Sequence, residues 1–322
     1  MTGRNEELHR SRPLASGLRW VVATAVLTLL LTGCFPTIRH VPERTRLPDS
    51  ATVLPIDYRN GELIANVALD GQGPFRLKLD TGASVNAISE VVRGKLGIET
   101  SGRMPWRLTG AGESRWRSIV SGRIDQVSCG DVQFDGVDCL VLDDLEDDGF
   151  VGNGLFDVGL LTLDFPESKF TLAPGRLAAR ADTVPFRLGA GVPLFFGVID
   201  ERPVEFTIDT GFNGWIRLPL EWESKLEFVG GRYAIDVQTI HRVRNEVVRQ
   251  IDGDLVIGPH RLRRPIVVLG PGAPLIGTRG LEAFRVTLDF GEKRVRFERA
   301  SAEPIPVPVL DDLFGASVPV AE

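Results

Sequence analysis

The sequence predicts an all-β fold made of two lobes that share one architecture, and two observations carry this prediction. Short stretches alternate apolar and polar residues, which is the period-2 pattern of half-buried strands. The chain also has 35 glycines and 21 prolines, which indicate many turns, and little helical periodicity. The same series of landmarks occurs twice. A chain of 322 residues has room for two lobes with a sizeable core in each.

The repeat is clearest at two Asp-Thr-Gly triplets, Asp80–Gly82 and Asp209–Gly211. Each triplet follows an alternating strand, with apolar residues one, three and five places ahead of the aspartate. One carboxylate at the end of a strand is unremarkable in a protein. Two carboxylates on matched scaffolds can share a proton, and such a pair can activate water.

Further landmarks follow each triplet in the same order. Each half contains an apolar-apolar-Gly segment and then a hairpin with a charged turn, at 150–152 and 161–172 in the first half and at 275–277 and 286–297 in the second. Matching positions are 129 residues apart at the aspartates and 125 apart at the hairpins. This spacing predicts a first lobe over 53–178 and a second over 184–298. Asp164 and Asp289 follow strands and precede turns, so turn capping is the expected role of both.

The N-terminal 33 residues have the features of a targeting segment, with a basic lead and an apolar run that is short for a bilayer. The run ends in Leu-Thr-Gly-Cys at Cys34, which resembles the lipobox of bacterial lipoprotein signal peptides. That resemblance implies cleavage before Cys34, lipidation of its sulfur and a place in the bacterial cell envelope. Phe35 after the cysteine resembles outer-membrane sorting. A plain secretory signal and an uncleaved anchor are the alternatives. We expect 34–52 to be a tether and 299–322 to be a Pro-rich extended tail.

Composition limits the partners. After removal of the signal, 33 basic and 41 acidic residues leave a net charge of −8, which argues against nucleic-acid binding. The histidines show no metal-ligand spacing, so we expect no metal and no cofactor. The acidic run 143–148 is either a solvated loop or a cation-binding segment. Cys129 and Cys139 flank a short hairpin, and either a disulfide in an oxidising compartment or two buried thiols would fit.

The landmarks of the first half resemble those of aspartic proteases of the pepsin and retropepsin type, and most closely the bacterial retropepsin-like proteins. The first half has Asp-Thr-Gly-Ala-Ser over 80–84, then a glycine-containing hairpin over 106–117, then Phe-Val-Gly over 150–152. The resemblance implies two β-barrel lobes with an active-site cleft between them. It also implies a peptide or protein substrate, catalysis by Asp80 and Asp209 without a cofactor, and a monomer, because one chain supplies both aspartates.

The resemblance also assigns supporting roles. Thr81 and Thr210 would hold the two loops together through their hydroxyl groups, Gly82 and Gly211 would allow the tight turns, and Ser84 would orient Asp80. Gly110, Ala111 and Gly112 would form the tip of a mobile flap. Trp106 and Trp116, on the two strands of that hairpin, would either line a substrate groove or pack against each other.

The second site departs from the pattern. Phe212 and Asn213 stand where a small residue and Ser or Thr are expected, although Asn213 could still hydrogen-bond to a carboxylate. The best flap counterpart in the second half, 229–232, lies too early to align well. Two functions therefore remain. The first is an aspartic endopeptidase anchored at the cell envelope, and the alternative is a catalytically silent two-lobed lipoprotein that binds peptides or proteins.

Overall fold

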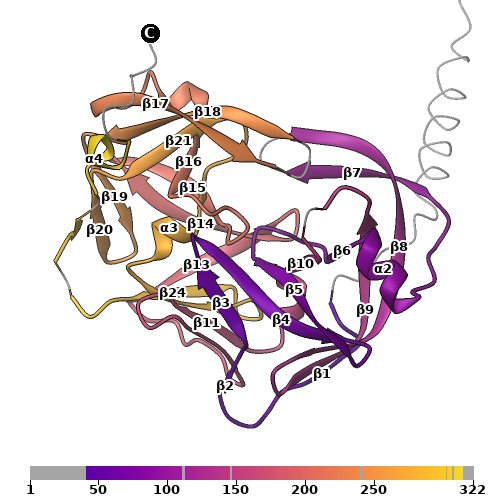
Figure 1. Cartoon of the computed structure of the whole chain (residues 1–322). Coiled ribbons are helices and arrows are strands. Elements are labelled where there is room, and N and C mark those ends of the chain that lie inside the picture. The colour runs from indigo at the N-terminus through magenta and orange to yellow at the C-terminus, as the bar shows by residue number, and fades with distance from the viewer. Residues whose placement is uncertain are drawn as a thin grey trace, which may run out of the picture. The chain divides into compact units, whose positions relative to one another are not determined.

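The computed structural model of the chain describes residues 41–110, 113–145, 147–239, 242–301, 303–306 and 308–314 (Figure 1). Cys34 and the segment 1–33 lie outside the described residues. Almost all of the described secondary structure is β-strand, and the strands fall into two repeated sets, so the predicted all-β, two-lobed fold is confirmed. Among the described residues, no helix has the length and apolar character needed to span a membrane.

The first lobe contains one short α-helix and one 3₁₀-helix among its strands. Its elements are β1 (Arg44–Arg46), β2 (Thr52–Val53), β3 (Ile56–Arg59), β4 (Glu62–Leu69), β5 (Gln72–Asp80), β6 (Ala87–Ser89), α2 (Glu90–Leu96), β7 (Met104–Gly110), β8 (Glu113–Cys129), β9 (Val132–Leu142), β10 (Gly149–Gly152), η1 (Asn153–Phe156), β11 (Leu160–Asp164) and β12 (Lys169–Ala173).

The second lobe repeats this order, with the long strands of the first lobe divided into shorter ones. Its elements are β13 (Thr183–Gly189), β14 (Val192–Ile199), β15 (Arg202–Ile208), β16 (Ile216–Pro219), η2 (Leu220–Trp222), β17 (Phe228–Gln238), β18 (Val243–Ile251), β19 (Asp254–Ile257), β20 (His260–Arg263), β21 (Ile266–Gly270), β22 (Leu275–Ile276), α3 (Thr278–Leu281), β23 (Arg285–Asp289), β24 (Arg294–Glu298), β25 (Ile305–Pro306) and α4 (Leu310–Phe314).

Each Asp-Thr-Gly triplet occupies the same place in its lobe. β5, which ends at Asp80, pairs in parallel with β10, and β15, which ends just before Asp209, pairs in parallel with β22. β10 and β22 then pair antiparallel with β6 and β16, the strands that follow the two triplets. The apolar-apolar-Gly segments found in the sequence are therefore the strands that lie beside the two aspartates.

The repeated hairpins of the two lobes pair with each other in one sheet. β11 and β23 pair antiparallel, and repeat-related residues meet in this pairing, because Thr162 lies opposite Thr287 and their hydroxyl oxygens are 3.1 Å apart. Asp164 and Asp289 lie at the ends of these strands, and both are buried. Each accepts a backbone N–H from the turn that follows, from Glu167 at 3.4 Å and from Glu292 at 3.0 Å. The expected turn-capping role is confirmed for both.

Alternation along the strands builds a core that both lobes share. Leu77 and Leu79 of β5 and Phe206 and Ile208 of β15 are buried, as the period-2 pattern predicts. These residues belong to one continuous apolar cluster, together with residues of the strands that join the lobes. Burial of this apolar surface is the main stabilising contribution to the fold.

The boundaries predicted for the tether and the tail are wrong. β1 pairs with β9, and Arg46 in β1 binds Asp135 at 2.5 Å, so the end of the predicted tether is part of the first lobe. In the predicted tail, β25 pairs with β20, and Leu310 of α4 is fully buried against the second lobe. The many prolines suggested an extended chain, but the apolar residues between them supply anchors that the compositional argument did not weigh.

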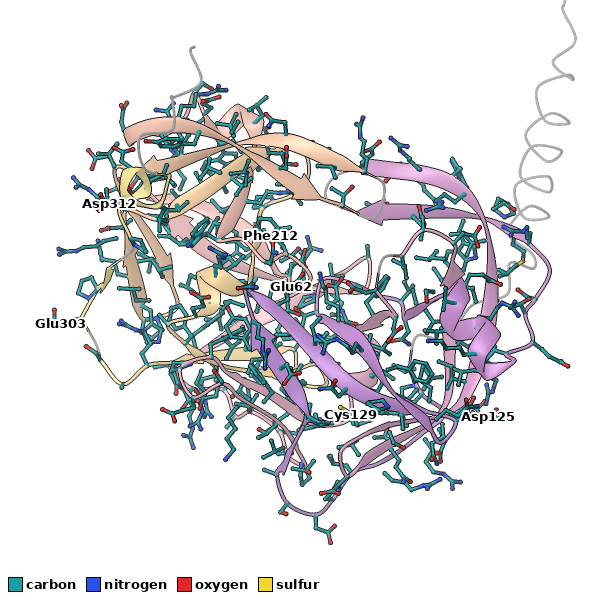
Figure 2. The ribbon with its side chains drawn as sticks, viewed as in Figure 1. Glu62, Asp125, Cys129, Phe212, Glu303 and Asp312 are labelled. Carbon is teal, nitrogen blue, oxygen red and sulfur yellow. The ribbon has the colours of Figure 1, made fainter. Side chains whose placement is uncertain are left out.

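The suggested disulfide is also wrong, because Cys129 and Cys139 are free, buried thiols. Cys129 lies opposite Val132 at the turn of the β8–β9 hairpin, whereas Cys139 lies opposite Gly122. Seven residues of extended strand separate Val132 from Cys139, which is roughly 23 Å at about 3.3 Å per residue. A disulfide requires Cα atoms within about 7 Å. The hairpin is much longer than its sequence suggested. Figure 2 shows Cys129 at the end of this hairpin that lies away from β7.

Candidate active site

The two catalytic candidates lie at the ends of equivalent strands, and their loops have nearly the same local geometry. The backbone N–H of Gly82 donates to Asp80 Oδ1 at 2.9 Å, and that of Gly211 donates to Asp209 Oδ1 at 3.0 Å. Each carboxylate is thus held by the turn that follows it. Both aspartates are half-buried, so their side chains are enclosed by protein but keep a solvent-facing surface.

Thr81 and Thr210 connect the two loops through four hydrogen bonds. The Thr81 hydroxyl donates to the carbonyl of Ile208 at 2.7 Å, and the Thr210 hydroxyl donates to the carbonyl of Leu79 at 2.6 Å. Each hydroxyl also accepts the backbone N–H of the other threonine, at 3.0 and 3.1 Å. Both threonines are 0% exposed. This reciprocal network has the form that the resemblance implied, and it fixes the position of one aspartate relative to the other.

The glycines of the triplets bring each loop against the opposite carboxylate. A Cβ atom on Gly82 would lie 2.5 Å from Asp209 Cγ, and one on Gly211 would lie 2.5 Å from Asp80 Cγ. Since Cβ atoms do not approach heavy atoms so closely, only glycine fits at either position. The two carboxyl groups therefore face each other across the loops, and they share a hydrogen bond.

Burial and mutual repulsion make this pair of carboxyls hold a proton. Desolvation, and then the nearby Asp209 carboxylate, raise the pKa of Asp80 to about 8. Desolvation also raises the pKa of Asp209, but the N–H groups of Gly211 and Phe212 and the charge of Arg217 act in the opposite direction. The dyad thus keeps a proton into the neutral range, where mutual repulsion favours one protonated and one ionised carboxyl.

Two supporting residues of the predicted site lie elsewhere. Within the described part of the chain, no hydrogen bond joins Ser84 to Asp80, and Ser84 packs instead against Gly191 in the turn between β13 and β14. Asn213 is exposed, and its backbone and Cβ pack against Gly61 in the turn between β3 and β4. The hydrogen bonds expected from these side chains come instead from backbone N–H groups, of Gly82 to Asp80 and of Gly211 and Phe212 to Asp209. The role expected of Ser84 is therefore not supported.

Two residues that the sequence analysis missed hold these turns in place. Asn153 Nδ2 donates to the carbonyl of Gly191 at 2.7 Å, and the Thr278 hydroxyl donates to the carbonyl of Gly61 at 2.5 Å. The two residues are equivalent in the repeat, since each directly follows its apolar-apolar-Gly segment. Each of these hydrogen bonds crosses from one lobe to the other. A polar residue at the same place in both halves was the signal that could have identified them.

The predicted flap hairpin is present as β7 and β8, which pair from Met104 opposite Ile119 to Gly110 opposite Glu113. Its tip residues Ala111 and Gly112 lie outside the described residues. Trp106 lies opposite Arg117 and Trp116 opposite Arg107, so the two tryptophans point to opposite faces of the hairpin. They neither pack on each other nor line one surface together. Trp106 shares its face with the buried Leu108, whereas Trp116 is 71% exposed.

The second lobe has an equivalent hairpin, formed by β17 and β18, which pair as far as Gln238 opposite Val243. The glycines at 230–231, which the sequence offers as the best but poorly aligned flap counterpart, lie at an irregularity near the start of β17. The two hairpins meet near their tips, where Arg242 Nε lies 3.2 Å from Glu113 Oε2. Figure 1 shows β7 and β8 of the first lobe extending toward β17 and β18 of the second.

The acidic run 143–148 provides partners for arginines near the β7–β8 hairpin. Arg117 lies 2.9 Å from both carboxylate oxygens of Asp144, and Arg103 lies 3.8 Å from Asp143. Asp148 accepts the backbone N–H of Arg76 at 2.8 Å. These contacts fit the solvated-loop interpretation. Among the described residues, no group of three or more His, Cys, Asp or Glu side chains is arranged to hold a metal ion.

Comparison with known proteins agrees with the geometry of the first lobe. Residues 65–165 match a family model described as aspartyl protease, and this match includes Asp80, the β7–β8 hairpin and the Phe-Val-Gly segment. No curated protein matches the chain. The first lobe is therefore similar, from residue 65 to residue 165, to the aspartyl protease family.

Proposed function

We propose that the chain is an aspartic endopeptidase in which Asp80 and Asp209 form a single catalytic dyad. The observation that carries this proposal is the pair of half-buried carboxyl groups that face each other across two loops joined by Thr81 and Thr210. A structural ion pair would place a cation between two such groups. Here burial and mutual repulsion raise the pKa of Asp80, and burial raises that of Asp209, which favours a proton shared between them. Acid–base catalysis by two carboxyls requires that state.

The chemistry follows from the two protonation states. The ionised carboxylate accepts a proton from a bound water while the water oxygen attacks the scissile carbonyl carbon. The protonated carboxyl donates its proton to the carbonyl oxygen, which gives a neutral tetrahedral diol. Transfer of a proton to the amide nitrogen and collapse of the diol then break the C–N bond and release an acid and an amine. Each carboxyl acts once as a base and once as an acid, so the dyad returns to its starting state.

The substrate class follows from the hairpins. The β7–β8 and β17–β18 hairpins meet through Glu113 and Arg242, and an extended peptide bound between them and the dyad would pair its backbone with strand edges. Closing the hairpins over the peptide would exclude bulk water from the dyad. We therefore propose that unfolded or extended segments of proteins are the substrates, and that one chain suffices because both aspartates belong to it.

The proposed location rests on the sequence alone. The short apolar run and Cys34 support a lipid anchor at the bacterial cell envelope, on the periplasmic side, with the outer membrane favoured by Phe35. Membrane fractionation of the Cys34→Ser variant tests this, since the variant should leave the membrane fraction. Retention of the variant in the membrane would exclude lipidation as the means of attachment.

Separate Asp80→Asn and Asp209→Asn variants test the dyad. Both should lose peptide cleavage by about 100- to 10,000-fold, because each removes one partner of the acid–base pair. The readout is cleavage of an unfolded protein and a peptide library between pH 4 and 8. Asp125→Asn is the matched control, since Asp125 is exposed and lies far from Phe212 (Figure 2). Full activity in the Asp209 variant would contradict the dyad. Absence of cleavage by the wild type throughout would favour the silent binding protein.

A further inference from the structure

Arg217 is a charged residue in the core of the second lobe. Its side chain is 1% exposed, and it is among the largest fully buried side chains in the described residues. Counting 129 residues back in the sequence gives Ile88, and strand register gives its neighbour Ala87, since Arg217 pairs with Leu275 as Ala87 pairs with Phe150; both are buried. Arginine is almost never buried so completely without a specific partner, because removing its charge from water is costly. The second lobe therefore keeps a guanidinium where the first lobe shows that an apolar side chain fits.

The guanidinium belongs to a cluster of three charges on β16 and β18. Arg217 Nη2 lies 2.6 Å from Glu246 Oε2, and Arg244 Nη2 lies 3.1 Å from Glu246 Oε1. Arg217 is the more deeply buried of the two cations, and its guanidinium contacts Phe212 of the catalytic loop. Water and salt screen a buried charge less than an exposed one, so the charge of Arg217 acts over a longer distance than it would at the surface.

Phe212 connects this cluster to the catalytic loop. The Arg217 guanidinium carbon lies 5.0 Å from the centre of the Phe212 ring, within the range of a cation–π contact. The ring also packs against the backbone at Gly277, where a Cβ atom would lie 2.5 Å from Phe212 Cδ1. The backbone N–H of the same phenylalanine donates to Asp209 Oδ1 at 3.2 Å. The large residue at 212 therefore fills the space between the buried cluster and the loop that holds Asp209.

The two aspartates differ in what supports their negative charge. Asp209 Oδ1 accepts two backbone N–H groups, from Gly211 and Phe212, whereas Asp80 Oδ1 accepts one, from Gly82. Hydrogen bonds to the charged form favour ionisation. Both the additional donor and the buried guanidinium lie on the side of Asp209.

We propose that Arg217, fixed by Glu246 and Phe212, is a positioning residue that keeps the negative charge of the dyad on Asp209 and leaves the shared proton on Asp80. This inference rests on the proposed function and refines it. Asp209 is then the base that takes the proton of the attacking water, and Asp80 is the acid that protonates the scissile carbonyl. The unusual Phe212 belongs to this arrangement and is not a sign of a degenerate site.

The charges around the dyad act in both directions on the two aspartates. Desolvation raises the pKa of both aspartates; at Asp209 the charge of Arg217 opposes this rise, whereas at Asp80 the Asp209 charge adds to it. Lys78 on β5 acts in the opposite sense, because it lowers the pKa of Asp80. Lys78 is partly exposed and is bound to Glu62 at 2.8 Å, so its effect on the pKa of Asp80 is partly neutralised. Glu246 opposes the charge of Arg217, but Arg244 in turn opposes Glu246.

A titration that needs no activity tests the proposal. The carboxyl carbons of aspartate are labelled with ¹³C, and NMR follows Asp209 in the Asp80→Asn variant and Asp80 in the Asp209→Asn variant. We expect Asp209 to titrate at least about one pH unit below Asp80. Equal midpoints, or a lower midpoint for Asp80, would overturn the proposal. A wild-type protein without cleavage activity would refute the proposed function and leave this comparison intact.

Variants at position 217 then test the source of the asymmetry. In the Asp80→Asn background, Arg217→Met combined with Glu246→Gln should raise the midpoint of Asp209 by about one pH unit or more, because the guanidinium that contacts Phe212 beside Asp209 is gone. The glutamine leaves Arg244 an acceptor and avoids an unpaired buried carboxylate. Arg217→Lys keeps the charge and should keep the midpoint. In the active protein, the acid limb of the pH–rate profile should move upward in the double variant alone.

Ile88→Met is the matched control, since it changes a buried residue of β6, the first-lobe counterpart of β16, without changing charge, and it should move neither midpoint. Circular dichroism and the melting temperature establish that each variant is folded. If the double variant does not fold, equal midpoints of the two aspartates in the unmodified Arg217 background still overturn the proposal. An unchanged Asp209 midpoint in a folded double variant would exclude Arg217 as the cause.

Discussion

The two lobes share one framework but differ in what lies beneath their catalytic loops. In the first lobe, the residues beneath the loop include Ala83 and the buried Ile88, which are both apolar. In the second, Phe212 and Arg217 place a ring and a buried guanidinium beneath the loop. An acid and a base must differ in protonation at the same pH, so two identical environments would leave the choice between them to chance. When a duplicated fold lies on one chain, the surroundings of its two aspartates can differ. In this protein the second lobe carries the difference, at Phe212 and Arg217.

Where the lobes meet, the repeat has remained symmetric. Thr81 and Thr210 make the same pair of bonds in opposite directions, and Asn153 and Thr278 both reach a carbonyl of the other lobe. Thr162 and Thr287 also face each other between β11 and β23. These positions set the distance between the loops. Geometry is thus conserved between the halves, while the charge environment has diverged.

The largest effect should come from the proton that the two lobes share. Because the pKa of Asp80 is raised to about 8, cleavage should persist to neutral pH and fall about tenfold per pH unit above 8, where the dyad loses its last proton. Initial rates on one peptide across pH 4 to 10 measure this. A loss of activity already complete by pH 6 would contradict the raised pKa.

The raised pKa of Asp80 also makes the stability of the fold depend on pH. A carboxyl whose pKa is raised by folding contributes stability below its unfolded pKa, and this contribution is lost as pH rises through the folded value. Between pH 4 and 8, the melting temperature of the wild type should therefore fall more than that of Asp80→Asn, which has no proton to lose at this position. Parallel curves for the two proteins would show that the dyad is not coupled to folding.

The threonine network should be the next most sensitive feature, and equally so from either lobe. Thr81→Val or Thr210→Val removes one buried hydroxyl and leaves a buried carbonyl and N–H in the opposite loop without partners. Each variant should lose about 2–4 kcal/mol of unfolding free energy, measured by urea denaturation. The double variant should lose less than the sum, since both hydroxyls belong to one network. A large loss from one lobe only would show that the lobes do not support each other equally.

The sequence predicted the parts of the fold that local pattern determines. Alternation ahead of Asp80 and Asp209 identified their strands, and the repeat identified the two lobes, because period-2 burial and turn residues are local signals. It failed where distant pairing decides the outcome. The length of the β8–β9 hairpin, which separates Cys129 from Cys139, depends on register over the whole strand. The docking of α4 depends on an apolar surface of the second lobe.

As with the fold, the sequence predicted the parts of the site that lie in local motifs. Asp80, Asp209, Thr81 and Thr210 lie in short motifs, and all four lie at the junction of the lobes. Arg217 gave no motif, because an arginine in a short strand reads as a surface residue until its burial is known. The second hairpin was missed for a related reason. Two consecutive glycines at 230–231 are typical of a turn, but β17 continues past them and pairs with β18 as far as Gln238.

The smallest effect should come from the contact between the two hairpins, and it tests whether both lobes contribute a flap. Glu113 and Arg242 lie 3.2 Å apart at the surface, so screening by water makes the pair weak. Glu113→Gln and Arg242→Gln should each raise KM about two- to fivefold and leave kcat unchanged, since the pair holds the hairpins over bound substrate and does not touch the dyad. Steady-state kinetics of the two single variants and the double variant form a thermodynamic cycle.

The coupling in that cycle should disappear at 0.5 M NaCl, because exposed ion pairs are screened at high ionic strength. Arg261→Gln is the control, since Arg261 forms a similar exposed pair with Asp254 on the β19–β20 hairpin. An increase in KM for Glu113→Gln without one for Arg242→Gln would mean that the first lobe alone supplies a working flap. Equal increases would show that the two hairpins close together, and that the lobes, unequal beneath their catalytic loops, act as equals above them.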